Sequence, residues 1–327
     1  MGAAREPVRA GPAHPLGLHR VRIPHPGDLV SSRPQALTEW AFGKAGEIGG
    51  IVRGVNDVVV VPSWRRLREG EVSEKAPGEF VTIADRRAED MLSERLTRLL
   101  PGSATVGEEA VGRDPQVLDR LHSDAPVWII DPIDGTENFI AGSPRFTTLL
   151  ALAWRGTAVA SWIYVPMLQL LGTAQLGMGA TLNGVPVAPK INPPDLTRVK
   201  VALSRPRWWT PDTHRWATNL DNAGIEWSSF DTAGLGYLHL LTGRHDVMIM
   251  TWEHVWDHAA GMLLHTEAGG RVTAADGRLF QLGGGNRLPL IAGPGPNTDR
   301  RIRRVLEQAP PVQATCRRRL RDQAEFL

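Results

Sequence analysis

The residues of this 327-residue sequence that are best suited to chemistry are carboxylates at the ends of predicted strands and helices. The most specific group lies in the run 131–139, DPIDGTENF, which follows the apolar stretch VWII at 127–130. Asp131 and Asp134 leave the end of this predicted strand across a proline, which fixes the turn between them. Paired carboxylates are good ligands for a hard divalent cation. An Asx turn with a helix cap would explain the same two residues without any ligand.

Gly135 and Thr136 continue this run. A glycine lets the backbone approach a ligand closely, and a threonine opens a helix whose free N–H groups attract an anion. The complete run therefore predicts a divalent cation with a phosphate beside it.

Three other acidic segments lie at the ends of predicted elements. Glu108 and Glu109 follow a short predicted strand at 104–106. Asp257 opens one predicted helix and Asp85 opens another. Taken singly, adjacent glutamates are typical of a solvated loop, and each aspartate is typical of a helix N-cap. Beside a cation, Glu108 becomes a natural ligand instead.

The elements that position these residues are predicted from hydrophobic periodicity and turn signals. Helices are expected over 35–55, 85–100, 213–223, 232–243, 257–268 and 297–307. Strands are expected over 80–83, 104–106, 127–130, 146–153, 158–165, 199–203, 246–250, 271–273 and 289–292. Because both halves mix strands with helices, the sequence predicts a layered α/β (α+β) sandwich.

The composition is that of a globular protein, with 42% hydrophobic and 22% charged residues. No apolar run approaches the roughly 18 residues that a membrane-spanning helix needs. The single cysteine, Cys316, excludes an internal disulfide and a cysteine-based zinc site. Residues 1–34 contain no apolar signal segment, so a reducing cytoplasm is the expected compartment.

Basic residues gather toward the two ends of the chain, although the formal net charge is only +2. Residues 1–34 predict a flexible, Pro-rich arm, and 308–327 predict a basic tail. Such tails are ordinarily solvated extensions. Nucleic-acid binding is the alternative, and it predicts a steep salt dependence that disappears when the tails are trimmed.

Four motifs connect the acidic segments, in the order TIAD (82–85), GEE (107–109), WIIDPIDGTENF (128–139) and WDHAAG (256–261), followed by TEAGG (266–270). Together they resemble the inositol monophosphatase family of magnesium-dependent, lithium-sensitive sugar phosphatases, over about residues 35–305. The resemblance implies an αβαβα sandwich of two mixed halves, 35–184 and 185–307. It also implies a homodimer that hydrolyses a small phosphate monoester with a metal-activated water.

The resemblance implies two Mg²⁺ ions. The first would be held by Glu108, Asp131 and the backbone carbonyl of Ile133, and the second by Asp131, Asp134 and Asp257. Most of these ligands belong to the first half, and Asp257 belongs to the second.

Further roles follow from the same positions. A weaker third ion, present in some members, would lie near Glu108 and Asp85. Gly135 and Thr136 would donate backbone N–H groups to the phosphate. Thr136, oriented by Asp85, matches the pair that activates the attacking water in this family.

The substrate is less constrained than the reaction. Met250 stands where inositol-binding members have a glutamate, and it cannot accept the hydrogen bonds of sugar hydroxyls. The stretch Asp231-Thr232-Ala233 matches one that lines the family's substrate pocket. Asp231 either binds a hydroxyl or an amine of the substrate or caps the helix that starts at Thr232. Trp252 is either a core residue or part of a pocket for a ring-bearing substrate.

Several functions stay open at this point. Within the family, the alternatives to an inositol phosphate are histidinol phosphate, fructose 1,6-bisphosphate, 3′-phosphoadenosine phosphate and other sugar or nucleoside phosphates. A metal- and phosphate-binding regulator without catalysis would be a different class of protein. It predicts a degraded activating pair, whereas Asp85 and Thr136 are both present.

Overall fold

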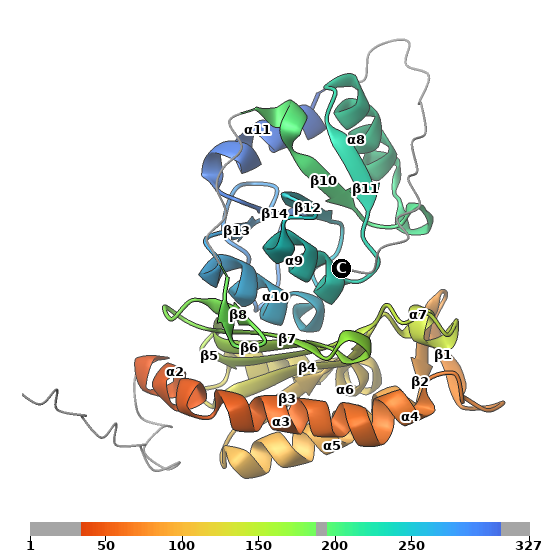
Figure 1. Ribbon diagram of the computed structural model, residues 1–327, viewed down its shortest axis with the longest axis vertical. Coiled ribbons are helices and arrows are strands. Elements are labelled where there is room, and N and C mark those ends of the chain that lie inside the picture. Colours follow the sequence, from red (N-terminus) through yellow and green to blue (C-terminus); the bar gives the residue numbers. More distant parts are fainter. Residues whose placement is uncertain (1–33, 188–194, 309–327) are drawn as a thin grey trace, which may run out of the picture.

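The structure is a computed structural model that describes residues 34–187 and 195–308. Its helices and its two large sheets form five stacked layers in the order helices, sheet, helices, sheet, helices (Figure 1). This αβαβα sandwich confirms the expected fold. Cys316, nearly all of the expected N-terminal arm and nearly all of the C-terminal tail lie outside the described residues.

The first large sheet has seven strands, in the order β3-β4-β5-β6-β7-β8-β9. They are β3 (Ala104–Gly107), β4 (Val127–Asp134), β5 (Thr147–Trp154), β6 (Thr157–Val165), β7 (Leu170–Gln175), β8 (Ala180–Leu182) and β9 (Val185–Pro186). β3 and β4 are parallel, and every later pair is antiparallel. One face is covered by α2 (Pro34–Gly43), α3 (Ala45–Val55) and α5 (Ile83–Leu99), and the other by α9 (Ala233–Thr242) and α10 (Val255–Glu267) (Figure 1).

The central strands of this sheet are buried on both faces. Every residue of β4 and β5 is buried, including Asp131 and Asp134 at the end of β4. A strand covered by helices on both sides reads as a continuous apolar run rather than an alternating pattern. The apolar run at 127–130 therefore forms a central strand that carries its two carboxylates into the interior.

The second large sheet has five strands, in the order β11-β10-β12-β14-β13. They are β10 (Lys200–Leu203), β11 (Glu226–Ser229), β12 (Val247–Met250), β13 (Arg271–Thr273) and β14 (Leu290–Gly293). β10 pairs in parallel with both β11 and β12. The outer face of this five-stranded sheet is covered by α8 (Pro211–Asn222) and α11 (Pro296–Leu306) (Figure 1).

The two halves share one hydrophobic core. Helices α9 and α10 belong to the second half in sequence but pack against strands β5 and β6 of the first. A single cluster of buried side chains joins Ile163 in β6, Leu238 in α9 and Met248 in β12. A side chain in α10 is therefore held at a fixed place relative to the end of β4.

Several elements differ from the sequence predictions, which also contained no counterpart of strands β7, β8 and β9. The helix expected over 35–55 is divided into α2 and α3 at Lys44, and the chain continues through a π-helical turn, η1 (Asn56–Val60), into α4 (Val61–Ser63). The polar stretch before residue 80 contains β1 (Val72–Ala76), which forms a two-stranded hairpin with β2 (Glu79–Thr82). Strand β11 was not predicted, because its residues are half-buried and lie at the edge of the second sheet.

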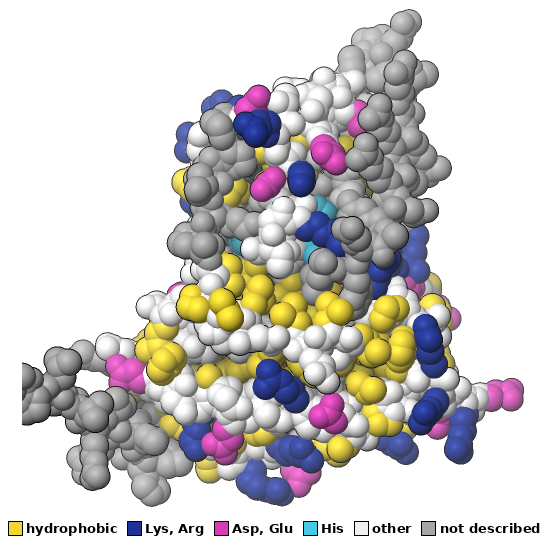
Figure 2. Space-filling model, viewed as in Figure 1, with side chains coloured by type: hydrophobic (Ala, Val, Ile, Leu, Met, Phe, Trp, Pro, Cys, Tyr) yellow, Lys and Arg dark blue, Asp and Glu magenta, His cyan; other side chains and the backbone are white. Residues whose placement is uncertain are grey.

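Short helices complete the described chain. They are α6 (Glu108–Arg113), α7 (Thr136–Ile140), η2 (Pro115–His122), η3 (Pro166–Leu168), η4 (Leu196–Arg198) and η5 (Pro206–Trp208). Among the described residues, no helix combines the length and the apolar character that crossing a membrane requires. On the face drawn in Figure 2, hydrophobic side chains gather over the seven-stranded half, whereas charged side chains dominate along the lowest helical layer.

Candidate active site

A cavity of about 630 Å³ lies where the two halves meet. Its walls come from the β1–β2 hairpin, the ends of β3 and β4, the segment after β10, and the N-terminal turns of α9 and α10. One end of it, which we call the acidic end, is formed by Glu108, Asp131, Asp134 and Asp257. The sequence motifs expected to act together thus meet in one place.

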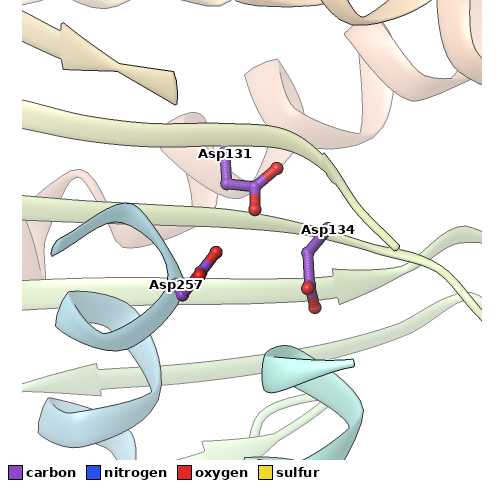
Figure 3. A group of neighbouring side chains, drawn as sticks. All are labelled: Asp131, Asp134 and Asp257. Carbon is purple, nitrogen blue, oxygen red and sulfur yellow. The ribbon is translucent and has the colours of Figure 1, made fainter. Parts of the chain in front are cut away.

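Three carboxylates define the centre of the acidic end. Asp131 and Asp134 leave the end of β4, and Asp257 lies in the first turn of α10. One carboxylate oxygen from each lies within 4.8 Å of the others, and all three side chains converge on the same space (Figure 3). No lysine or arginine in the described part of the chain makes an ion pair with any of the three, although His254 Nδ1 lies 3.6 Å from Asp257 Oδ2. This set of oxygen donors, in which Asp131 and Asp134 are buried and Asp257 is half-buried, fits a divalent cation such as Mg²⁺.

The end of β4 is shaped so that both of its aspartates face this space. The pairing of β4 with β5 shifts register between Asp131 and Asp134, which is a bulge. Asp131 accepts a hydrogen bond from the backbone N–H of Ile133 at 3.1 Å. The Asx turn considered as an alternative is therefore present, and Asp131 still faces the other two carboxylates.

Asp134 connects the two halves. It accepts hydrogen bonds from the Thr147 hydroxyl at 2.7 Å and from the backbone N–H groups of Ala233 and Gly234 at 3.2 and 2.7 Å. The two amides belong to the first turn of α9, whose positive dipole end favours a carboxylate. The position of Asp134 is thus set by the packing of α9 on the sheet.

The acidic end is electrostatically unfavourable without a cation. Burial raises the pKa of Asp134 to about 6, and the charge of Asp257 adds to this increase. Burial raises the pKa of Glu108 to about 8, against the attraction of Lys75. Burial, followed by repulsion from Glu108 and Asp134, holds the pKa of Asp131 well above its usual range. In each case the loss of water around the buried carboxylate outweighs the stabilisation that its neighbours provide.

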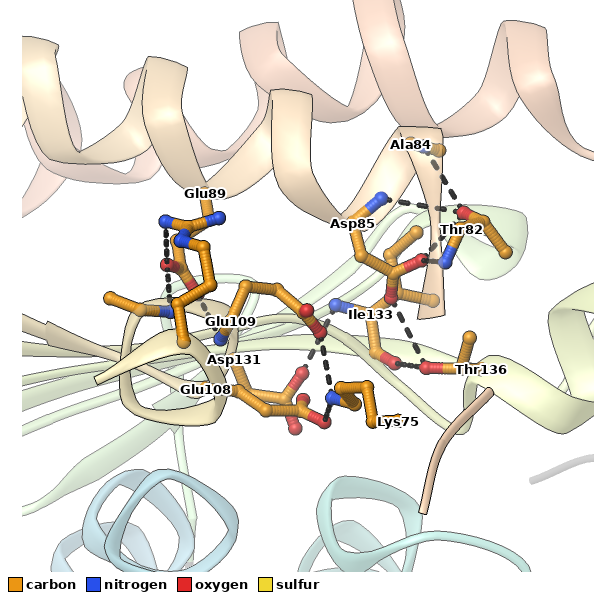
Figure 4. Close-up of polar contacts among 12 residues, drawn as sticks. Lys75, Thr82, Ala84, Asp85, Glu89, Glu108, Glu109, Asp131, Ile133 and Thr136 are labelled. Atoms are coloured by element: carbon orange, nitrogen blue, oxygen red, sulfur yellow. Dashed lines mark hydrogen bonds and ion pairs between the residues drawn. The ribbon is translucent and has the colours of Figure 1, made fainter. Parts of the chain in front are cut away.

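Lys75 supplies part of the missing charge, and the sequence analysis did not identify it. Its Nζ lies 2.7 Å from Glu108 Oε1 and 2.9 Å from Glu109 Oε1 (Figure 4). Burial alone would lower the pKa of Lys75, but these two carboxylates raise it above its ordinary value. Lys75 lies in β1, within a polar stretch that carries no pattern linking it to the glutamates.

Asp85 and Thr136 come together as the resemblance implies. The Thr136 hydroxyl lies 3.1 Å from Asp85 Oδ1 and 3.1 Å from the backbone carbonyl of Ile133 (Figure 4). The other oxygen of Asp85 accepts hydrogen bonds from the N–H and the hydroxyl of Thr82 at 2.8 and 2.5 Å, which forms a capping box at the start of α5. Burial raises the pKa of Asp85 to about 6, although its hydrogen bonds with Thr82 and Thr136 oppose the increase.

Gly135 is required by its conformation and by its surroundings. Its φ of +97° lies in the left-handed region, which favours glycine. A side chain there would also collide with the methyl group of Thr232. The left-handed turn at Gly135 places Thr136, the first residue of α7, directly after the bulge of β4.

Glu89 is a second residue that the sequence analysis did not identify. This buried carboxylate accepts hydrogen bonds from the backbone N–H groups of Glu109 and Ala110 at 2.7 and 2.8 Å (Figure 4). It thereby anchors the first turn of α6, where Glu108 is the first residue. A side chain at Gly107 would collide with it. The spacing of Asp85 and Glu89 by four positions on one helix was the available signal, since it places both on one face.

Asp257 is held by a tryptophan. The indole N–H of Trp252 donates to Asp257 Oδ2 at 2.6 Å. The ring of Trp252 lies 5.9 Å from that of Phe230 and 5.6 Å from that of His258. Trp252 also lines the cavity, so both interpretations considered for it, a packing residue and a wall of the pocket, hold at once.

The residues expected to contact the substrate are only partly brought together. Asp231, Thr232 and Ala233 line the cavity. Thr232 is the N-cap of α9 and accepts from the N–H of Leu235, so Asp231 does not cap that helix. Met250, in contrast, is fully buried in β12 and is absent from the cavity wall. Its strand directs the side chain into the shared core, so a contact between Met250 and the substrate stays a prediction.

Asp231 instead contacts two arginines. Its Oδ1 forms a short ion pair with Arg205, and its Oδ2 lies 3.4 Å from Arg145 Nη1. Arg205 also donates to Asn138 Oδ1 at 2.9 Å. The sequence analysis anticipated neither arginine at the site, since these contacts join segments that are distant in the chain.

Comparisons with known proteins agree with this geometry. A family model described as the inositol monophosphatase family matches residues 39–310. An inositol-1-monophosphatase from Mesorhizobium japonicum is 34% identical over 68% of this chain and 81% of its own length. The Nus factor SuhB from Vibrio cholerae is 30% identical over 69% of this chain and 84% of its own.

Solved structures show the same architecture. An IMPase from Thermotoga maritima superimposes with a TM-score of 0.67 and 24% identity, covering 81% of this chain and 96% of its own. The extragenic suppressor protein SuhB from Bartonella henselae superimposes with a TM-score of 0.62 and 29% identity, covering 79% of this chain and 98% of its own.

Proposed function

The chain belongs to the inositol monophosphatase family, and from that premise we propose that it hydrolyses a small phosphate monoester with an activated water. The relatives include proteins named as inositol-1-monophosphatases and others named as Nus factors, so membership supports a phosphatase without specifying its substrate. The specific activity must therefore be argued from the residues of this chain.

One observation carries the proposal. Three carboxylates, two of them buried and one half-buried, lie within 4.8 Å of one another with no lysine or arginine partner among the described residues, and the Asp85–Thr136 pair lies beside them. Once ionised, such a cluster is stabilised by bound positive charge, which favours a metal site over a structural one. The intact pair argues against a regulator that has lost catalysis, since such a protein has no need of it.

Mg²⁺ is the cation that we propose, held by Glu108, Asp131, Asp134, Asp257 and the carbonyl of Ile133. Two or three bound ions would supply Lewis-acid stabilisation of the phosphoryl oxygens and lower the pKa of a coordinated water. The donor set fits, because it consists of oxygen atoms only. Lys75 would keep Glu108 and Glu109 in place when the metal is bound, since it contacts one oxygen, Oε1, of each.

The residues of the chain itself would direct the proton of the attacking water. The Thr136 hydroxyl donates to Asp85, so its oxygen lone pairs are free to accept a hydrogen bond from water. At neutral pH Asp85, with a pKa of about 6, is mostly ionised and can draw the proton through Thr136. The backbone N–H groups of Gly135 and Thr136 would hold the phosphate.

Phosphate release from a panel of monoesters tests the proposal. The panel contains inositol 1-phosphate, histidinol phosphate, fructose 1,6-bisphosphate, 3′-phosphoadenosine phosphate and nucleoside 5′-monophosphates, each assayed with Mg²⁺ and with EDTA. We expect release that requires Mg²⁺ and that Asp131→Asn abolishes. Release from no ester, with Mg²⁺ still bound, would contradict the enzyme and favour the binding regulator.

Finer properties are proposed from the family alone. We expect inhibition by Li⁺, a homodimer and a cytoplasmic location. Light scattering at several concentrations tests the dimer, and an assay with and without Li⁺ tests the inhibition. Binding of nucleic acid by the terminal segments is not expected, and a flat salt dependence of a mobility-shift assay would agree with this.

A further inference from the structure

A buried chain of hydrogen bonds leads from the helical layer of the first half to the bulge of β4. The hydroxyl of Thr148 in β5 donates to the backbone carbonyl of Pro132 at 2.8 Å, and the side-chain amide of Asn56 donates to the Thr148 hydroxyl at 3.0 Å. Both side chains are buried, and neither lines the cavity. Any part that they play in the chemistry is therefore exerted through the backbone of the bulge.

The direction of these hydrogen bonds is fixed at both ends of the chain. A backbone carbonyl can only accept, so Thr148 donates to Pro132, and Asn56 Nδ2 donates to the carbonyl of Val52 at 3.0 Å. The one hydroxyl proton of Thr148 is thereby used, and the hydroxyl oxygen accepts from the second N–H of Asn56. The Oδ1 of Asn56 lies farther from the hydroxyl, at 3.3 Å. Each donor of the chain thus has an acceptor.

Thr148 is the residue of β5 that lies opposite the bulge. In the register of the two strands, Asp131 lies opposite Leu149. Asp134 lies opposite Thr147. One residue of β5, Thr148, therefore faces two residues of β4. Because a bulge disrupts the regular ladder of backbone hydrogen bonds, a side-chain donor at this position gives the bulge support that the ladder does not.

Two successive threonines hold the bulge from opposite faces of the sheet, since successive side chains of a strand alternate between faces. Thr147 donates to the carboxylate of Asp134 on the face covered by α9. Thr148 donates to the backbone of Pro132 on the face covered by α3 and η1. The first threonine thus fixes one carboxylate, and the second fixes the main chain that carries both.

Asn56 lies where an apolar residue would be expected. It is the first residue of the π-helical turn η1, and its neighbours Val52, Val55 and Val59 belong to a buried apolar cluster. A buried amide costs free energy unless its hydrogen bonds are satisfied. Isolated π-helical turns occur frequently at functional sites. Packing alone does not require an amide at this position, whereas support of Thr148 does.

We propose that Asn56 and Thr148 are positioning residues of the metal site. By holding the carbonyl of Pro132 they hold the bulge, so that the carboxylates of Asp131 and Asp134 keep the separation that Mg²⁺ requires. Mg²⁺ demands near-ideal octahedral geometry at about 2.0–2.1 Å, whereas Ca²⁺ tolerates flexible ligand sets at about 2.3–2.6 Å. A rigid bulge therefore favours Mg²⁺ over Ca²⁺. This inference rests on the proposed function for the identity of the site, but it concerns binding of the ion rather than hydrolysis.

Thr148→Val tests the chain of hydrogen bonds, because valine has nearly the same shape and lacks the hydroxyl. Titration calorimetry of the metal-free protein with MgCl₂ and, separately, with CaCl₂ measures both affinities. We expect the Mg²⁺ affinity to fall by about ten-fold, at the low end of the range for residues that orient metal ligands. The Ca²⁺ affinity should fall by no more than about three-fold, since Ca²⁺ accepts a looser arrangement. The ratio of the two affinities is the readout that a merely structural hydrogen bond leaves unchanged.

Thr38→Val is the matched control. The hydroxyl of Thr38 also donates to the backbone carbonyl of a proline, Pro34, at 2.9 Å, and the residue is equally buried at 3% exposure. It lies in α2, outside the cavity. Thr38→Val should at most lower Tm and leave both affinities unchanged. If Thr148→Val likewise changed Tm alone, the positioning role would be wrong.

A double substitution separates positioning from stability. Thr148→Val alone leaves the buried amide of Asn56 without one of its acceptors, which lowers Tm. Asn56→Leu combined with Thr148→Val replaces both polar partners by apolar groups, so Tm should return toward its native value. The ratio of Mg²⁺ to Ca²⁺ affinity should stay low, because the carbonyl of Pro132 still lacks its donor. A ratio that recovers together with Tm would overturn the proposal.

These outcomes can be told apart from the outcome of the hydrolysis assay. If the native chain binds Mg²⁺ but releases phosphate from no ester, the proposed phosphatase fails, and a lower affinity ratio in Thr148→Val still supports the positioning role. If phosphate release requires Mg²⁺ but the ratio is unchanged in Thr148→Val, the proposed function stands and the positioning role fails. Absence of Mg²⁺ binding by the native chain would overturn both.

Discussion

The two ends of the cavity are both charged, but they are built in different ways. At the acidic end, four carboxylates converge from β4, α6 and α10, and among the described residues their basic neighbours are Lys75 beside Glu108 and His254 beside Asp257. At the other end, which we call the basic end, Arg145 and Arg205 contact Asp231, and Arg207 contacts Glu137. The acidic end therefore carries more negative charge than its own basic side chains balance, whereas each arginine of the basic end has a carboxylate partner.

The charged side chains of the two ends are also positioned in different ways. Asp131 and Asp134 are held at a bulge by backbone and threonine hydrogen bonds, so their positions follow from the course of β4. Arg205 and Arg207 are placed by contacts between long side chains, which can change partners at little cost. Metal binding needs donor atoms at fixed positions, as at the acidic end. Side chains that can change partners, as at the basic end, adapt more easily to a substrate.

The largest effect should come from removing one charge at the acidic end. Asp131→Asn should lower kcat by at least about 1,000-fold, because it removes a shared ligand of both proposed ions. It should also abolish the increase in Tm that Mg²⁺ gives the native protein. Calorimetric scans with Mg²⁺ and with EDTA measure this increase alongside the activity assay.

Asp299→Asn is the matched control for that variant. Asp299 is equally buried, and burial raises its pKa to about 7, but it lies in α11 outside the cavity. Its substitution should change stability without changing the Mg²⁺-dependent increase in Tm. Similar losses of the Mg²⁺ effect in both variants would break the distinction between an ion-dependent end and the rest of the molecule.

The next largest effect concerns pH. Asp85 and Asp134 have a pKa of about 6, and Glu108 has a pKa of about 8, each above its ordinary value because of burial. The folded, metal-free chain retains these protons where the unfolded chain has released them. Its stability from these groups is therefore complete below about pH 4 and is lost as pH rises through 6 and then 8.

Mg²⁺ should reverse this trend, since it binds the ionised carboxylates and displaces their protons. The apparent affinity for Mg²⁺ should rise about ten-fold per pH unit between pH 6 and 8 if one proton is released per ion. Titration calorimetry in two buffers of different ionisation enthalpy measures both the affinity and the protons released. An affinity that does not change with pH would contradict the idea that the acidic end lacks its own counter-charge.

A smaller effect should follow from the residue that positions Glu108. Glu89→Gln replaces one acceptor oxygen by an N–H₂ group that faces a backbone N–H, so one anchor of α6 is lost. Mg²⁺ affinity should fall by about 10- to 100-fold, as for other residues that orient metal ligands, while the circular dichroism spectrum stays native.

Glu267→Gln controls for the chemistry of that change. Glu267 likewise accepts two backbone N–H groups, those of Gly177 and Gly179 at 2.8 and 2.9 Å, in the β7–β8 turn. The Glu267→Gln variant should at most be less stable than the native protein, and its Mg²⁺ affinity should be unchanged. If Glu89→Gln also changed only stability, Glu89 would be a structural residue with no positioning role.

The fold was largely predictable because its central elements are strongly apolar. The run at 127–130 and the paired segments 146–153 and 158–165 form β4, β5 and β6, and both faces of these strands are covered. Edge and hairpin elements such as β1 and β11 were missed, because their residues alternate weakly and gain order only from neighbouring strands. The local sequence of such a strand does not indicate which strand will pair with it.

The site divides in the same way. Asp131, Asp134, Asp257 and Glu108 could be identified from motifs, because each is fixed to the end of an element. The contacts of Arg205 and Arg145 with Asp231 could not be foreseen, since they join segments that are 26 and 86 positions apart in the sequence (231 − 205 and 231 − 145). The burial of Met250 could not be foreseen either, because its position in a motif does not state which face of β12 the side chain occupies.

The smallest predicted effect tests a residue that belongs to both ends. Trp252 lines the cavity and donates its indole N–H to Asp257, so Trp252→Phe keeps an aromatic wall while it removes the hydrogen bond. Mg²⁺ affinity should fall by about ten-fold, at the low end of the range for such partners, because Asp257 loses its fixed orientation. Trp227→Phe is the control, since Trp227 donates in the same way to Asp221 at 2.9 Å, outside the cavity. Tighter Mg²⁺ binding in Trp252→Phe would instead mean that the indole competes with the ion for Asp257, and the acidic end would then be partly balanced by the protein, as the basic end is.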